Sequence, residues 1–381
     1  MKSTLKIAFL TSTNPNDKRS WSGIHYCMFQ SLKNHFITVD AIGPIDNLGF
    51  KSLGAINKIT RFLFKKGYNH NNSIIRSYFL SLIINKRINK KKYDIIFAPA
   101  ASTEVAFIKT KVPIVYLSDS SFGQLNGYYD VFSNLFKASI KESNYIEQKG
   151  ISKASYFVYP SKWAADYVIK EYNVAKSRVS IVPFGANIDE NFIKNIEKTR
   201  KKGEVFKLLF IGVYWERKGG DIVFDTFKIL LDKGYDVSLT ICGCVPPVQH
   251  EKMKVYPFLN KNIDEDMNKL TDIIQESHVL FVPTRADCSP IVFCEASAFG
   301  LPIITTDTGG VSSIVENDIN GFYLPFNSGA TAYAEVIIKL IQDEEKYLKL
   351  SKTARKKYVE ELNWEKWSST MKDIFLKIKN I

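Results

Sequence analysis

The sequence predicts an α/β protein built from two doubly wound domains, each a mostly parallel sheet with helices on both faces. Three observations lead to this prediction. The chain has 381 residues, which is more than one hydrophobic core usually serves. Short apolar stretches alternate with amphipathic helical stretches, as is typical of parallel sheets covered by helices. The alternation stops at a polar, charged segment and begins again near Val205.

The first half contains four predicted strands separated by helical stretches. Each strand is a short run rich in β-branched and aromatic residues that ends in small or polar residues. The runs are LKIAFLT, YDIIFAPA, VPIVYLSD and ASYFVYPS, at residues 5–11, 93–100, 112–119 and 154–161. A helical stretch at residues 23–35 lies between the first two runs. We therefore expect a first domain over residues 1–188.

The second half repeats this architecture. Its predicted strands are FKLLFIG, DVSLTICG, VLFVPT and LPIITTD, at residues 206–212, 236–243, 279–284 and 301–307. An amphipathic helix over residues 220–234 ends at a glycine. These patterns predict a second domain over residues 205–363 and a linker at 189–204. The last stretch, residues 364–381, is amphipathic, and we expect it to form a helix that packs back on the first domain.

The cysteines, the histidines and the hydropathy exclude several classes of protein. None of the five cysteines forms a Cys-x-x-Cys pair, and the five histidines lie in no metal-ligand spacing. This usage predicts reduced thiols and a cytoplasmic protein. No run approaches the ~20 apolar residues that span a membrane. The N-terminal apolar stretch is too short for a signal peptide and suits a first strand better.

The positive charge of the chain is unevenly distributed. The net charge is +13, and no acidic residue occurs between Asp46 and Asp94. This basic segment interleaves eleven cations with aromatic residues: Lys51, Lys58, Arg61, Lys65, Lys66, Arg76, Lys86, Arg87, Lys90, Lys91 and Lys92, with Phe50, Phe62, Phe64, Tyr78 and Phe79. Such a segment suits an anionic membrane surface, and nucleic acid would use the same electrostatics. We expect peripheral contact with the inner face of the cytoplasmic membrane and no nucleic acid; a compositional bias toward lysine, asparagine and isoleucine is the alternative.

Two acidic residues flank a predicted helix start in the second half. Ser289 suits the N-cap of this helix, and the proline after it suits the first helical position, where no N–H is needed. The first backbone amides, near Ile291 and Val292, then form an anion site. Asp287 and Glu295 would repel phosphate and are better suited to accept hydrogen bonds from sugar hydroxyls. A capped helix with two solvated acids is the alternative.

The loop GVYWERKGGD, residues 212–221, supplies the opposite charge. It follows a predicted strand and opens a helix at a Gly-Gly pair, so Arg217 and Lys218 lie at a helix N-terminus. Cations there are unfavourable by ~0.3–1 kcal/mol each unless an anion binds beside them. Two cations, exposed amides and glycines together predict a diphosphate site. A plain basic turn is the alternative.

Two candidate residues of the first half lie just after strands, where doubly wound sheets bind ligands. Gly23 opens the first helix and would let a ligand approach the backbone. The loop before this helix lacks Gly-x-Gly-x-x-Gly, so the dinucleotide fingerprint is absent. Asp119 ends a predicted strand, and for it a helix cap or an Asx turn is the alternative.

In their order and spacing, these motifs resemble those of the retaining glycosyltransferases of family 4, which have the GT-B fold of two Rossmann-like domains facing a central cleft. The resemblance covers nearly all of the chain. DCSPIVFCE is similar to the Glu-x7-Glu element of the family, and ASAFGLPIITTDTGG and NDINGFYLP follow it in the family's order. GVYWERKGG is similar to the family's diphosphate loop, and WSGIHYCM to its first glycine loop.

The resemblance implies a role for each candidate residue. Arg217 and Lys218 would bind the nucleotide diphosphate and stabilise it as it leaves, and Glu295 would hold the ribose hydroxyls. Asp287 stands where the family has a glutamate that contacts the donor sugar, a side chain one methylene longer. Asp119 matches a strand-end position near the reacting carbon. Four further residues complete the implied donor site: Gly23, Ser289, Ile291 and Val292.

The resemblance also implies a function. We expect retaining transfer of a sugar from a nucleotide-diphosphate sugar to a hydroxyl of a glycan or lipid-linked acceptor, in synthesis of a bacterial capsule or lipopolysaccharide. The family needs no metal and no other cofactor. We interpret the acidic run Asp264–Asp266 as surface charge, because no strand precedes it. The alternatives are a nucleotide-sugar epimerase of the same fold and a non-catalytic protein that binds anionic membrane or nucleic acid.

Overall fold

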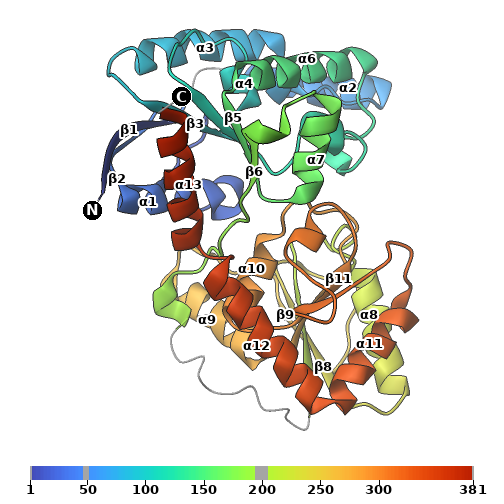
Figure 1. Cartoon of the computed structure of the whole chain (residues 1–381). Coiled ribbons are helices and arrows are strands. Elements are labelled where there is room, and N and C mark those ends of the chain that lie inside the picture. The colour runs from blue at the N-terminus through green and yellow to red at the C-terminus, as the bar shows by residue number, and fades with distance from the viewer. Residues whose placement is uncertain (1, 46–50, 194–204, 380–381) are drawn as a thin grey trace. The chain divides into compact units, whose positions relative to one another are not determined.

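The protein is described by a computed structural model that covers residues 2–45, 51–193 and 205–379. Within these residues the chain forms two α/β units (Figure 1). The predicted linker at 189–204 lies for most of its length outside the described residues.

Each unit contains one six-stranded sheet whose paired strands all run parallel. One unit comprises Met1–Val182 with Trp367–Ile381, and the other comprises Pro183–Lys366. The predicted fold class, two doubly wound parallel sheets, is therefore confirmed.

The first sheet has the strand order β2-β1-β3-β4-β5-β6. Its strands are β1 (Ser3–Phe9), β2 (Phe36–Ala41), β3 (Ile95–Pro99), β4 (Ile114–Leu117), β5 (Tyr156–Tyr159) and β6 (Val179–Ile181). Every residue of β3, β4 and β5 is buried. A parallel strand covered by helices on both sides buries both sets of alternating side chains, which explains the continuous apolar runs of the sequence.

Helices cover both faces of the first sheet. They are α1 (Ile24–His35), α2 (Lys51–Phe64), α3 (Ile74–Ile88), α4 (Ser102–Val105), α5 (Phe122–Leu125), α6 (Lys137–Lys153), α7 (Lys162–Glu171) and the last helix, α13 (Trp364–Lys379). In Figure 1, α3, α4 and α6 lie on one side of the strands, and α1 and α13 on the other. The Phe375 ring of α13 packs 5.6 Å from that of Phe97 and 5.7 Å from that of Phe36. The end of the chain thus contributes to the core of the first unit.

The second sheet has the strand order β12-β11-β10-β7-β8-β9. Its strands are β7 (Phe206–Ile211), β8 (Val237–Cys242), β9 (Met253–Tyr256), β10 (Val279–Val282), β11 (Ile303–Thr306) and β12 (Gly321–Leu324). Its helices are α8 (Gly220–Asp232), α9 (Asp264–Glu276), α10 (Ile291–Ala298), α11 (Ala330–Gln342) and α12 (Glu344–Glu360). Helices α8 and α11 lie side by side (Figure 1), where Thr226 Oγ1 donates to the Ala330 carbonyl at 3.2 Å.

All eight predicted strands are present, and four further strands were not predicted: β2, β6, β9 and β12. These four are the outer strands of the two sheets. Most of their residues are half-buried or exposed, because an edge strand has less of its surface covered. The apolar pattern that marks a central strand is therefore missing from their sequences.

Three further observations concern the described residues alone. All five cysteines are free thiols. None of the described helices is long and apolar enough to cross a membrane. Within the same residues, no three His, Cys, Asp or Glu side chains are grouped so as to hold a metal ion. Asp264–Asp266 form the first turn of α9, where the helix dipole favours acidic side chains.

Candidate functional site

The predicted site residues of the second unit lie in two loops at the carboxyl ends of its strands. One loop leads from β7 to α8, and the other leads from β10 to α10. Strands β7 and β10 are neighbours in the sheet, so the loops that follow them meet. The amide of Arg285 donates to the Arg217 carbonyl at 2.8 Å, and Thr284 Oγ1 donates to the same oxygen at 3.3 Å. These bonds hold the basic loop against the acidic one.

Lys218 and Asp287 form an ion pair between these two loops, with Nζ donating to Oδ2. Only 9% of Lys218 and 7% of Asp287 are exposed. Beside them, Nη1 of Arg217 donates to the Ala286 carbonyl at 2.7 Å. The structure thus brings both predicted cations together with the first predicted acid. A buried carboxylate is costly unless a cation pairs with it, so each partner depends on the other.

Gly219 lets the basic loop approach the end of β10. Its φ is 76°, in the left-handed region, and a Cβ at this position would lie 2.1 Å from the Pro283 carbonyl oxygen. Glycine alone satisfies both the backbone conformation and the available space. Gly219 is also the N-cap of α8, so Arg217 and Lys218 directly precede the first turn of this helix.

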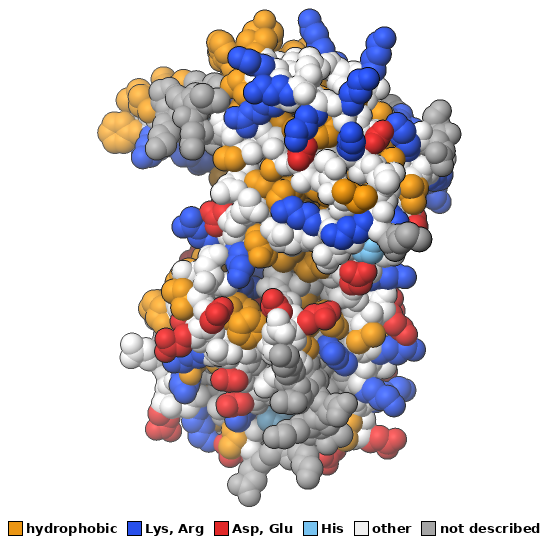
Figure 2. Space-filling model, turned by 90° about the vertical axis from the view of Figure 1, so that its left-hand side faces the viewer, with side chains coloured by type: hydrophobic (Ala, Val, Ile, Leu, Met, Phe, Trp, Pro, Cys, Tyr) orange, Lys and Arg blue, Asp and Glu red, His pale blue; other side chains and the backbone are white. Residues whose placement is uncertain are grey.

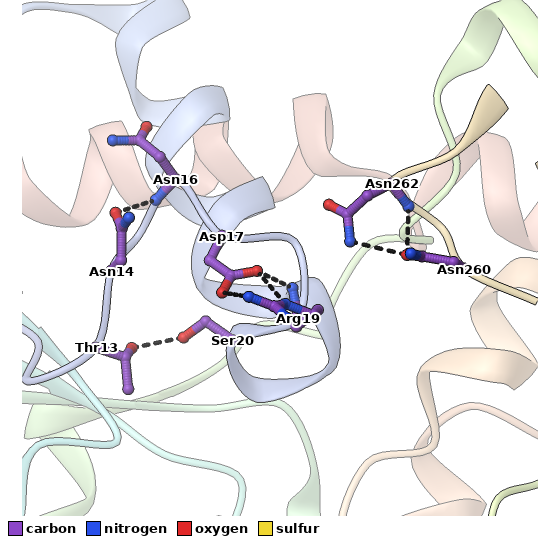
Figure 3. Close-up of polar contacts among 8 residues, drawn as sticks. All are labelled: Thr13, Asn14, Asn16, Asp17, Arg19, Ser20, Asn260 and Asn262. Atoms are coloured by element: carbon purple, nitrogen blue, oxygen red, sulfur yellow. Dashed lines mark hydrogen bonds and ion pairs between the residues drawn. The ribbon is translucent and has the colours of Figure 1, made fainter.

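Glu295, the second predicted acid, lies in α10 with 2% of its surface exposed and pairs with Lys261. Lys261 comes from the loop between β9 and α9. Asn262 holds this loop by donating its backbone N–H and its side-chain Nδ2 to Oδ1 of Asn260, at 3.1 and 3.0 Å (Figure 3). Glu295 therefore has a lysine partner of its own. Lys261 was not predicted, because 34 positions separate it from Glu295 and no motif links them.

Helix α10 begins one residue later than predicted. Pro290 is its N-cap, with ψ of 99°, and the helix starts at Ile291. Ser289 is therefore not the N-cap, and no side chain caps the helix. The first turn closes instead through the Phe293 amide, which donates to the Pro290 carbonyl at 2.9 Å. Ile291 and Val292, predicted as donor contacts, are the first two helical residues.

In the first unit, Gly23 ends a strained loop between β1 and α1. Trp21, Ser22 and Gly23 have φ of 48°, 56° and 88°. For residues other than glycine this left-handed conformation costs ~1–2 kcal/mol each, and it persists only where the surroundings impose it. Figure 3 shows polar contacts that hold the loop: Thr13 with Ser20 at 2.5 Å, and Asp17 with Arg19 at 2.9 Å.

His25, which was not predicted as a site residue, anchors the same loop to the sheet. Its Nε2 lies 3.3 Å from the Pro99 carbonyl oxygen, and its Nδ1 lies 3.0 Å from Oγ of Ser20. A carbonyl can only accept, so Nε2 carries the proton and Nδ1 accepts from the hydroxyl. Burial lowers the pKa of His25 to about 4, which keeps the ring neutral at pH 7. The imidazole thus fixes the loop without adding charge to it.

Asp119 follows β4 and lines a pocket of about 300 Å³ within the first unit. Ser120 Oγ donates to its Oδ1 at 3.2 Å. The helix that comes next, α5, is capped by Ser121, which forms a capping box with Gln124. Asp119 is therefore not the cap of that helix, and its place is on the wall of the pocket.

Two family models match the chain, one in each half. The model described as Glycosyltransferase Family 4 matches residues 49–190. The model described as Glycosyl transferases group 1 matches residues 191–357, which include both loops of the second unit. Together the two models cover all of the second sheet and strands β3 to β6 of the first, whereas β1 and β2 precede the matched residues.

Curated relatives and solved structures agree with these models. Over 222 residues the chain is 29% identical to the capsular polysaccharide biosynthesis glycosyltransferase CapM of Staphylococcus aureus, an alignment that spans 54% of this chain and 58% of that protein. Over 332 residues it is 22% identical to the UDP-Gal:alpha-D-GlcNAc-diphosphoundecaprenol alpha-1,3-galactosyltransferase of Escherichia coli, spanning 80% and 81%. The structure of Anabaena HepE in complex with UDP superimposes with a TM-score of 0.64 at 15% identity, over 98% of this chain and all of that one.

Proposed function

Because this chain belongs to the group 1 glycosyltransferases and has the GT-B fold, we propose that it moves a sugar from a nucleotide-diphosphate sugar to a hydroxyl of a lipid-linked glycan. The observation that carries this proposal is the cluster of Arg217, Lys218 and Asp287 at the start of α8. It combines two cations that can bind a diphosphate with a carboxylate that can accept hydrogen bonds from sugar hydroxyls.

In the proposed reaction, Arg217 and Lys218 stabilise the leaving diphosphate. Negative charge on the diphosphate grows as the sugar departs, and fixed cations near that charge are usually the largest contribution to catalysis. Both side chains are already held in place, Arg217 by the Ala286 carbonyl and Lys218 by Asp287. The reaction uses these cations rather than a metal ion. The leaving phosphate accepts the proton of the attacking hydroxyl, and the anomeric configuration is retained.

The two acids and the first unit complete the proposed donor contacts. Asp287 accepts hydrogen bonds from the transferred sugar, and Glu295 accepts them from the ribose. Lys261, which pairs with Glu295, then lies next to the ribose as well. Gly23 approaches the donor phosphates with its backbone, and Asp119 contacts substrate near the reacting carbon.

The acceptor is proposed from the relatives. The staphylococcal relative is named for capsular polysaccharide biosynthesis, and the Escherichia coli relative for galactosyl transfer to a diphosphoundecaprenol-linked sugar. We propose an acceptor of the same class, a lipid-linked intermediate of capsule or lipopolysaccharide synthesis.

Nucleotide diphosphates are expected to raise the melting temperature of the protein. A ligand at ~100 times its dissociation constant stabilises by ~2.7 kcal/mol. The measurement is thermal unfolding with UDP, GDP, ADP and dTDP and with their sugar conjugates, for the wild type and for Lys218→Ala. We expect a shift with one base and a smaller shift in the variant. Absence of a shift with all of them would contradict the proposal. Conversion of the donor to another nucleotide sugar without an acceptor would identify an epimerase instead.

The first unit exposes apolar side chains that suit a membrane surface. They lie on α2 and α3: Ile56, Ile59, Phe62, Leu63 and Phe64, then Ile75, Tyr78, Phe79 and Leu82. Phe62 is 79% exposed, and large exposed apolar groups mark interaction sites. The upper part of Figure 2 shows apolar side chains at the surface with lysines and arginines among them. Exposed lysines on and after these helices are Lys58, Lys65, Lys66, Lys86, Lys90, Lys91 and Lys92.

Not every cation of the basic segment is available for such contact. Arg76 is buried, and its Nη1 donates to the Asn71 carbonyl at 3.1 Å. Arg87 donates to the Ile42 carbonyl at 2.6 Å. These two arginines have structural bonds, whereas the exposed lysines and aromatic rings present much of their surface to solvent, where lipid headgroups can contact them. We therefore propose that α2 and α3 dock on an anionic bilayer, where each lysine contributes ~1 kcal/mol.

Wild-type protein is expected to float with vesicles of phosphatidylcholine and phosphatidylglycerol, and not with phosphatidylcholine alone. Combining Phe62→Ser with Lys58→Glu and Lys66→Glu should weaken this binding at least ~tenfold, because it removes an apolar anchor and reverses two charges. The matched control combines Phe326→Ser with Lys349→Glu and Lys352→Glu, exposed positions of the second unit. Failure of the wild type to float, or equal loss in both triple variants, would contradict membrane docking.

A further inference from the structure

Arg285, in the loop from β10 to α10, holds the basic loop of residues 212–221 through both its backbone and its side chain. Its amide donates to the Arg217 carbonyl at 2.8 Å, and its Nη1 donates to the Glu216 carbonyl. These two carbonyls belong to the peptide groups on either side of Arg217. The backbone of Arg217 is therefore fixed by a residue whose side chain has no role in the proposed transfer.

The same guanidinium group forms an ion pair with Asp221, which lies in the first turn of α8. Nη1 donates to Oδ1 at 2.7 Å, and Nη2 donates to Oδ2 at 2.6 Å. Two parallel bonds of this kind fix the direction of a guanidinium group as well as its distance from the carboxylate. The hydrogen bonds from Arg285 lower the pKa of Asp221, so the carboxylate is ionised at neutral pH. Arg285 thus joins its own loop to the start of the helix that follows the basic loop.

The two residues after Arg285 hold the two cations of the proposed donor site. The Ala286 carbonyl accepts from Nη1 of Arg217 at 2.7 Å, and Asp287 pairs with Lys218. Three consecutive residues therefore contact the basic loop, and Arg285 is the first of them. A change in how Arg285 binds this loop would shift both cations relative to the groups that hold them.

Stability alone is a weak explanation for the pair of Arg285 with Asp221. The two side chains are 40% and 50% exposed, and exposed ion pairs contribute little to the free energy of folding. Position and charge are better explanations. A displacement of ~1 Å in a catalytic group can slow a reaction ~10²-fold. A carboxylate in the first turn of α8 would also repel a diphosphate bound at the start of this helix, unless a cation offsets its charge.

Resting on the proposed function, we propose that Arg285 is a positioning residue of the donor site. Its side chain fixes the backbone of Arg217 through the Glu216 carbonyl, and its pair with Asp221 fixes the start of α8. The same pair offsets the negative charge of Asp221 beside the bound diphosphate. Arg285 therefore affects the reaction through Arg217 and Lys218, which stabilise the leaving group.

Two measurements on the full chain test this role: single-turnover release of the nucleoside diphosphate, and the dissociation constant of UDP, GDP, ADP or dTDP, whichever the wild type binds. Arg285→Ala should slow release at least ~tenfold, because the cations are displaced. It should also weaken nucleotide binding ~threefold, because the charge of Asp221 is no longer offset. Asp221→Asn breaks the same pair but removes that charge. It should slow release at least ~threefold without weakening nucleotide binding. A merely structural role would not separate the two quantities in this way.

A double variant and a matched control complete the design. Arg285→Ala with Asp221→Asn should release the diphosphate no more slowly than Arg285→Ala alone, because both substitutions break one pair. The control is Lys252→Ala, which breaks a pair with Asp236 at 2.9 Å whose side chains are 43% and 51% exposed. It should change neither release nor binding. The melting temperature of every variant should stay within ~4 °C of the wild type, as is usual for exposed ion pairs.

Three results would overturn the inference: Arg285→Ala releases the diphosphate at the wild-type rate, Lys252→Ala slows release as much, or Asp221→Asn weakens nucleotide binding as much as Arg285→Ala does. If Arg285→Ala does not fold, release and binding in Asp221→Asn decide the matter. Wild-type release that Arg285→Ala leaves unchanged would refute the positioning role and leave the proposed transfer standing. A wild type that neither binds a nucleotide nor releases one from a sugar donor would refute both.

Discussion

Replacement of Lys218 with alanine is expected to slow release of the nucleoside diphosphate from the donor by ~10²-fold or more. A fixed donor of positive charge that faces developing negative charge is worth about this much when it is removed. Lys218 is placed for that task by its pair with Asp287 and by its position just before the first turn of α8. The measurement is single-turnover release of the nucleoside diphosphate. The donor is the nucleotide sugar that shifts the melting temperature most.

The same substitution also leaves the buried Asp287 without its cation, so lost stability must be separated from lost catalysis. Breaking a buried pair by removal of one partner is strongly destabilising, whereas removal of both charges is much less so. The double variant Lys218→Ala with Asp287→Asn should therefore recover the melting temperature but not the turnover. Lys228→Ala, which breaks an exposed pair with Asp225 on α8, is the control and should leave both unchanged. Wild-type turnover in Lys218→Ala would contradict the proposed role of Lys218 in stabilising the leaving diphosphate.

Gly219→Ala is expected to destabilise the second unit by about 3 kcal/mol or more and to abolish nucleotide binding. The left-handed backbone alone costs ~1–2 kcal/mol for a residue with a Cβ. The rest comes from the contact of 2.1 Å between that Cβ and the Pro283 carbonyl oxygen, which forces the basic loop away from β10. Urea denaturation and the nucleotide-induced shift in melting temperature measure the two effects.

Gly234, which follows the C-cap residue of α8, provides a matched control at the other end of this helix. Its φ is 81°, close to the 76° of Gly219, and an added Cβ would meet nothing within 4 Å. Gly234→Ala should therefore show only the cost of the backbone conformation, ~1–2 kcal/mol, and should keep nucleotide binding. Equal destabilisation by the two substitutions would show that the close approach of the loop to Pro283 has no energetic role.

The central strands of both sheets could be predicted because a strand that is buried on both faces requires a continuous run of apolar residues. Every strand with two neighbours was predicted from such a run, for example β4 with its four buried residues. The four edge strands were missed for the complementary reason. In β9, for instance, Met253–Tyr256 is only partly covered, so its pattern does not differ from that of a loop.

Some residues of the candidate site could likewise be predicted from the sequence, and others could not. Arg217, Lys218 and Asp287 could be proposed from the sequence because each lies in a loop that follows a strand and precedes a helix. Glu295 lies inside α10 and could be proposed from its spacing to Asp287, which resembles the family element. The N-cap preference of serine placed the start of α10 one residue too early. Pro290, and not Ser289, is the N-cap of this helix.

The sequence by itself determined which loops carry charge and which strands form the centre of each sheet, because both are encoded in short contiguous patterns. Only the tertiary structure decided which side chains meet. Lys261 reaches Glu295 across 34 positions, and His25 reaches the Pro99 carbonyl across 74. Glu147 of α6 lines the same pocket as Asp119, which follows β4. Such contacts depend on strand order and helix packing, which bring distant residues together without leaving a local pattern in the chain.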